Sequence, residues 1–94
     1  MATIGVLTLE IVLQNSHSLK DKRHVVKSLK DRLRSRFNVA VAEIDYQDLW
    51  QRAVVAAVTV SPDHGHAEKV LQSVEEEAAA LLGPELAGAT VEWM

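Results

Sequence analysis

The chain has 94 residues, no cysteine and a formal net charge of −3 at pH 7. Its hydrophobic fraction of 48% is enough for the core of one domain of this length, so we expect residues 1–94 to form a single domain. The absence of cysteine excludes disulfides, thiolate metal sites and thiol nucleophiles.

The N-terminal segment shows no pattern of a targeting or membrane-spanning segment. Its apolar run is interrupted at Thr8 and Glu10, well short of the roughly 20 apolar residues that span a bilayer. No basic stretch precedes this run, as a secretory signal peptide would require. We therefore expect a cytoplasmic protein with no membrane partner.

Residues 3–13 predict the first strand, because aliphatic side chains alternate along it. The face that we expect in the core carries Leu7, Leu9, Ile11 and Leu13. Residues 19–37 then predict an amphipathic helix, because apolar residues recur at steps of three, four and seven. Ser18 and Asp21 resemble a capping pair at its start, and Asn38 is the expected C-cap.

The rest of the chain predicts three more strands and a second helix. The strands are expected at residues 39–45, 51–60 and 89–94, where β-branched and small apolar residues predominate. Ser61-Pro62-Asp63 is typical of a helix start with Pro62 at the first helical position. The helix is expected to run to about Leu82, before Gly83-Pro84.

Two β-α-β halves joined by a short β–β connection predict an α+β, ferredoxin-like fold. Its two helices would lie on one face of a four-stranded antiparallel sheet, in the order β-α-β-β-α-β. The other face is expected to be open, half aliphatic and half acidic. The residues that we assign to this open face are Val6, Thr8, Glu10, Val12, Val39, Val41, Glu43 and Asp45.

Positive charge is concentrated in the first helix. Residues 19–37 hold eight of the ten basic residues and two acidic ones, a local net charge of +6. The remainder holds two basic and eleven acidic residues, a net charge of −9. Five of the eight fall within about an 80° sector and span about 21 Å along the helix. This basic stripe consists of Lys20, Arg23, Lys27, Lys30 and Arg34 and includes no acidic residue.

Two interpretations of the basic stripe remain open. The solvent face of any amphipathic helix is polar, so the stripe is explained by solvation alone. An ordinary solvated face, however, alternates acidic with basic residues at i, i+4, whereas five cations in a row suit the phosphates of a nucleic acid. Among anionic partners we favour RNA or a ribosomal particle over a membrane, because the opposite helix face is expected in the core.

The open sheet face is the second candidate surface. The first and third strands carry no aromatic residue on which a base stacks, so we do not expect RNA recognition by the sheet. Self-association through a partly apolar face is the alternative, with the protein as a homodimer or protein-interaction module.

Signals of catalysis or ligand binding are weak. His64 and His66 lie two residues apart, but no further ligands with a recognisable spacing accompany them. Gly5 alone makes no phosphate loop, and nothing places Glu43 and Asp45 in a cleft. We therefore expect no enzyme activity, no metal, no cofactor and no small-molecule ligand.

Four ordered segments of the chain resemble the YlxP-like family of small bacterial proteins. They are residues 18–23 (SLKDKR), 26–29 (VKSL), 37–43 (FNVAVAE) and 48–53 (DLWQRA). The resemblance implies a ferredoxin-like fold and brings no established activity with it. Genes of this family commonly lie among those for transcription elongation, translation initiation and ribosome maturation factors, which implies an RNA-linked role by association.

Overall fold

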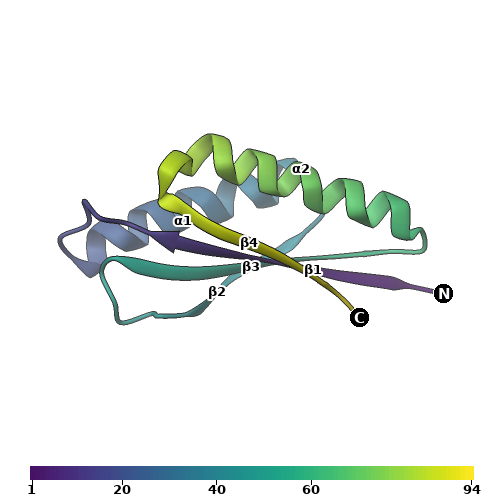
Figure 1. Cartoon of the computed structure of the whole chain (residues 1–94), viewed down its shortest axis with the longest axis horizontal. Helices are drawn as coiled ribbons and strands as arrows, with labels where there is room; N and C mark the ends of the chain where they lie inside the picture. Colours follow the sequence, from purple (N-terminus) through teal and green to yellow (C-terminus); the bar gives the residue numbers. More distant parts are fainter.

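The computed structural model describes residues 1–94 as four strands and two long helices (Figure 1). The elements are β1 (Thr3–Val12), α1 (Leu19–Arg36), β2 (Ala40–Asp45), β3 (Arg52–Ser61), α2 (His64–Leu82), a 3-10 turn (Gly83–Glu85) and β4 (Leu86–Trp93). The strands form one antiparallel sheet in the order β2-β3-β1-β4, and both helices cover the same face. The predicted ferredoxin-like α+β fold is thus confirmed. Neither α1 nor α2 contains an apolar stretch of the length that a membrane-spanning helix needs.

The start of α1 agrees with the sequence pattern. The backbone N–H of Asp21 donates to Ser18 Oγ at 3.1 Å, and the Asp21 carboxylate accepts the N–H of His17 at 3.0 Å. These bonds satisfy amides that have no partner within the helix. The C-cap is Phe37 and not Asn38, because the N–H of Phe37 donates to the Leu33 carbonyl.

The second helix and the last strand begin elsewhere than predicted. Asp63 is the N-cap of α2, since its carboxylate accepts the N–H of Gly65 at 3.0 Å. Pro62 therefore precedes the helix, and the expectation of Pro62 at the first helical position is wrong. Strand β4 begins at Leu86 and not at residue 89, because the 3-10 turn leads directly into the pairing of Leu86 with Ile11 of β1.

The core lies between the sheet and the two helices. The predicted core face of β1 is confirmed, because Leu7, Leu9, Ile11 and Leu13 are each at most 1% exposed. The other strands and the helices complete the core with Val26, Leu29, Leu33, Val41, Ala53, Val55, Ala57, Leu71, Val74, Ala78 and Leu82. Burial of these side chains is the main free-energy gain that holds both helices on the sheet.

The predicted orientation of β2 is wrong. Val41 pairs with Ala57 and Glu43 pairs with Val55, and both β3 partners are fully buried beneath the helices. Because paired residues of antiparallel strands share a face, Val41 and Glu43 also point to the helix side. Val39 packs against the core as well. Of the β2 residues expected on the open face, only Asp45 pairs with a β3 residue of that face, after a register shift.

The open sheet face is consequently more apolar than the sequence predicted. The register places on it the aliphatic residues Ile4, Val6, Val12, Ala40, Ala42, Val54, Ala56, Val58 and Val60. Charge is restricted to Glu10, Asp45, Arg52 and Glu92 on the same face. The helices leave this side of the sheet uncovered (Figure 1).

Candidate nucleic-acid interface

The basic stripe borders a hollow between α1 and β2. Four of its five residues line this hollow of about 410 Å³, namely Arg23, Lys27, Lys30 and Arg34. Glu43 of β2 lines the opposite side, which places the stripe on the flank of α1 that faces β2. Lys20 lies one turn before Arg23 and is exposed. The structure thus brings together at this hollow four of the five residues that helical spacing grouped.

One acidic residue reduces the charge of the stripe. Asp31 Oδ2 lies 2.6 Å from Lys27 Nζ, and its other carboxylate oxygen lies 3.9 Å from Arg34 Nη1. The hydrogen bond from Lys27, together with the charges of Arg34 and Lys30, lowers the pKa of the Asp31 carboxyl below its ordinary value. Asp31 is therefore ionised at neutral pH and offsets one of the five positive charges. The stripe itself includes no acidic residue, but Asp31 lies directly beside it.

The remaining stripe residues are available to a partner. Lys20, Arg23 and Lys30 form no salt bridge within the protein. Lys20 and Arg23 are exposed, and Lys30 is partly exposed. Ammonium and guanidinium groups that have no internal ion pair bind an external anion without first losing one.

Two other arginines of α1 join the helices and do not belong to the stripe. Arg32 Nη1 lies 3.2 Å from one carboxylate oxygen of Glu77, and Arg36 Nη1 lies 3.0 Å from the other. Glu77 belongs to α2, so these pairs lie on the flank of α1 opposite the stripe. They provide a matched set of charges for testing the stripe.

Lys22 is buried under the connection between β2 and β3, a role that the sequence did not predict. Its side chain is 1% exposed, and its Nζ lies 3.0 Å from Glu43 Oε2. The same ammonium donates to the carbonyls of Tyr46 at 2.6 Å and Gln47 at 3.1 Å. It also donates to the carbonyl of Arg52 at 3.4 Å. These three carbonyls match its three protons, whereas Glu43 Oε2 accepts no hydrogen bond and interacts with the ammonium by charge. One feature of the sequence indicates this burial: Lys22 lies four residues before Val26 and so on the apolar face of α1.

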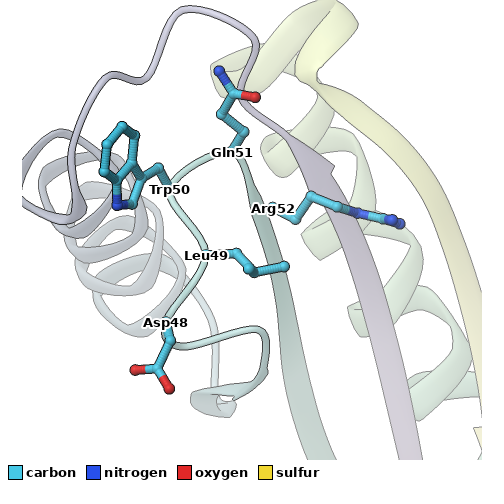
Figure 2. Close-up of a pocket in the computed structure, with 5 residues that line it drawn as sticks. All are labelled: Asp48, Leu49, Trp50, Gln51 and Arg52. Atoms are coloured by element: carbon cyan, nitrogen blue, oxygen red, sulfur yellow. The ribbon is translucent and has the colours of Figure 1, made fainter.

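The connection that Lys22 holds is the second exposed feature at this end of the molecule. Residues 48–52 line a hollow of about 380 Å³ there (Figure 2). Leu49 and Trp50 are 46% and 53% exposed, respectively, and their side chains leave the chain in opposite directions. More than half of Trp50 is thus open to solvent.

His64, the first residue of the histidine pair, lies beside an aromatic ring and a carboxylate. His64 stacks obliquely on Trp93 of β4, with ring centroids 4.3 Å apart, and its Nε2 lies 3.7 Å from Glu68. Trp93 also crosses Gly5, where a Cβ would lie 2.5 Å from the indole ring, so this contact requires glycine. No group of three or more His, Cys, Asp or Glu side chains is gathered in the structure.

Comparison with known sequences assigns the family. Residues 4–90 match the family described as "Protein of unknown function (DUF503)". The chain belongs to this DUF503 family. The chain is also 41% identical over 71 residues to uncharacterized protein YlxP of Bacillus subtilis (strain 168), and the matched stretch covers 76% of this chain and 77% of that protein. The YlxP-like resemblance of the four segments is therefore confirmed.

Solved structures share the fold of this DUF503 protein at low sequence identity. The de novo designed protein Foldit4 superposes with a TM-score of 0.63 at 12% identity, covering 100% of this chain and 97% of the other. A putative antibiotic biosynthesis monooxygenase from Caulobacter crescentus CB15 gives 0.55 at 14% identity, covering 99% and 88%. At such identities the likeness is one of fold alone.

Proposed function

We propose that the protein is a cytoplasmic, non-enzymatic accessory protein that binds RNA or a ribosomal particle through its basic stripe. The observation that carries the proposal is the hollow between α1 and β2, which gathers Arg23, Lys27, Lys30 and Arg34. A row of cations on one helix flank matches the regular charge of a phosphate backbone. Affinity then comes from charge and position, with little reading of base edges.

The distribution of charge supports a polyanionic partner. Outside residues 19–37 the chain has a net charge of −9, so phosphates are repelled from other surfaces and directed to α1. Three stripe cations have no ion pair to break on binding. Asp31 opposes the interaction by one charge, so we expect about four phosphates to be neutralised and log K to fall against log salt with a slope of about −3 to −4.

The test is fluorescence anisotropy of labelled structured RNA across a series of salt concentrations. The double variant Arg23→Gln, Lys30→Gln is expected to weaken binding and to reduce the steepness of the salt slope by about two. Asp31→Asn is expected to have the opposite effect and tighten binding, because it removes the acid that offsets the stripe. Both effects should be equal across RNA sequences, since phosphate contacts carry no sequence information.

A control variant on the same helix distinguishes an effect of the stripe from an effect of positive charge elsewhere on α1. Arg32→Gln, Arg36→Gln removes the same two charges from the flank that pairs with Glu77. We expect this variant to bind RNA much more tightly than the stripe variant. Equal losses for the two pairs, or no RNA binding by the unmodified protein at low salt, would contradict the proposal.

A second candidate function, homodimerisation, is favoured by the apolar character of the open sheet face. A second copy fits this face because its charges are self-complementary. Glu10 pairs with Val54, and Arg52 pairs with Val12, so both charges lie at one end of the two central strands. A twofold axis parallel to these strands places β1 of each copy over β3 of the other, and Glu10 near Arg52.

Light scattering tests the dimer. The chain mass is 10.4 kDa, and we expect about twice this mass in solution for a twofold dimer. Val58→Lys on the open face should return the mass to that of one chain, because an unpaired charge at an interface is costly. Ala79→Lys, at an exposed position of α2, adds the same charge on the helix side and should leave the dimer intact. A monomeric unmodified protein would exclude this function.

A further inference from the structure

Trp50 is a large aromatic side chain held in an exposed position. It is 53% exposed, against 37% for Trp93, the other tryptophan. A tryptophan on the surface of a protein usually has most of its ring covered. The exposure of Trp50 therefore needs an explanation other than packing.

The connection that carries Trp50 is anchored on both sides of it. On one side, Lys22 Nζ binds the carbonyls of Tyr46 and Gln47. On the other, the side chain of Gln51 donates to the carbonyls of Gln14 and Ser16, at 3.4 and 3.3 Å. Exposure of the ring is thus imposed by an anchored backbone, and such a backbone loses little freedom when a ligand stacks on the ring.

These anchors also place the connection at the first turns of α1. Lys22 lies between Lys20 and Arg23, the first two residues of the stripe, and Ser16 lies two residues before the N-cap of α1. Trp50 points to the side of the loop between β1 and α1, whereas Leu49 points away from it (Figure 2). Trp50 and the first two residues of the basic stripe therefore lie at the same end of α1.

We propose that Trp50 stacks on an unpaired base of RNA whose adjacent phosphates are bound by Lys20 and Arg23. This inference rests on the proposed function and specifies its ligand as a single-stranded segment or loop. Side chains three residues apart on a helix are about 5–6 Å apart at Cβ, which suits consecutive phosphates. The hollow of about 380 Å³ beside Trp50 lies within the size range of small-ligand sites. Every base presents a face for stacking, so sequence selectivity is low.

The test uses the fluorescence of Trp50 itself. In a Trp93→Phe background, Trp50 is the only tryptophan, and circular dichroism checks that this variant is folded. We expect a single-stranded oligoribonucleotide to quench its emission, and inorganic polyphosphate, which has no bases, to leave it unchanged. Trp50→Ala should weaken binding of the oligoribonucleotide by about 5- to 150-fold and leave polyphosphate binding unchanged. Trp50→Phe should restore part of the loss, because phenylalanine also stacks.

Leu49→Ala is the control, because it removes an exposed neighbour without removing a ring. Equal losses from Leu49→Ala and Trp50→Ala would indicate a general apolar contact and overturn the stacking site. Quenching by polyphosphate as strong as that by RNA would overturn it too. If RNA binds with the expected salt slope but Trp50→Ala has no effect, the stacking site is wrong and the stripe is right. If no RNA binds at low salt, the proposed function itself is wrong.

Discussion

Replacement of Lys22 by alanine is expected to lower the free energy of unfolding by about 3–5 kcal/mol, the cost of leaving a buried charge without its partner. Lys22 is 1% exposed, and Glu43 is the only carboxylate that it pairs with. Without the ammonium, this carboxylate faces the helix side of the sheet unpaired, and the carbonyls of Tyr46 and Gln47 lose a donor. Urea denaturation followed by circular dichroism measures the change.

Lys20→Ala is the matched control, since it removes an exposed lysine two residues away on the same helix. It should change the free energy of unfolding by no more than about 0.5 kcal/mol. The double variant Lys22→Ala, Glu43→Ala should be less destabilised than the sum of its parts, because it leaves no unpaired charge. Equal stability of Lys22→Ala and Lys20→Ala would show that the buried pair contributes nothing.

The same variant connects stability with the proposed RNA site. In the Trp93→Phe background, Lys22→Ala should shift the emission of Trp50 and weaken stacking, because residues 46 and 47 are no longer held. Phosphate binding by Arg23 and Lys30 should persist, since no salt bridge joins these side chains to the connection. Lys22 is thus a positioning residue for Trp50 and not itself a contact to the ligand.

Helical spacing alone predicted the members of the basic stripe. A turn of 100° per residue fixes which side chains share a flank once the helix is recognised. That is why Arg23, Lys27, Lys30 and Arg34 border one hollow in the structure. The ion pair of Lys27 with Asp31 obeys the same rule, at i, i+4, although Asp31 lies outside the sector that defines the stripe.

The roles of Lys22 and of the connection depend on contacts between distant residues. Lys22 meets Tyr46 across 24 positions of sequence, and no local pattern specifies such a contact. A lysine on an apolar helix face usually extends its aliphatic stem and exposes its ammonium. Here the ammonium remains buried because Glu43 points to the helix side and backbone carbonyls accept its protons. Its burial therefore became predictable only once the register of β2 was known.

The two candidate functions are compatible in space. A dimer through the open sheet face leaves α1 of both copies on the outside, because the helices cover the other side of each sheet (Figure 1). The twofold operation then presents two basic stripes on opposite outer surfaces. If both proposals hold, such an assembly would bind two RNA segments, or one segment long enough to reach both stripes, and the second case would add avidity.

The register of β2 yields the second prediction with a large effect. Val41 is 6% exposed and pairs with Ala57 in the core, whereas the next residue, Ala42, is exposed and pairs with Ala56 on the open face. Val41→Lys is therefore expected to lower the free energy of unfolding by about 2–4 kcal/mol, since it loses a core side chain and brings an unpaired charge to it. Urea denaturation at low protein concentration measures the loss.

Ala42→Lys adds the same charge one residue further along and is the control for β2. At low protein concentration, where self-association does not contribute, it should change the stability by no more than about 0.5 kcal/mol. At higher concentration it should reduce the dimer measured by light scattering, because Ala42 lies on the open face. A one-residue slip of β2 would exchange the two faces and therefore the two phenotypes. A stable Val41→Lys beside an unfolded Ala42→Lys would thus show that β2 is paired in the register that the sequence first predicted.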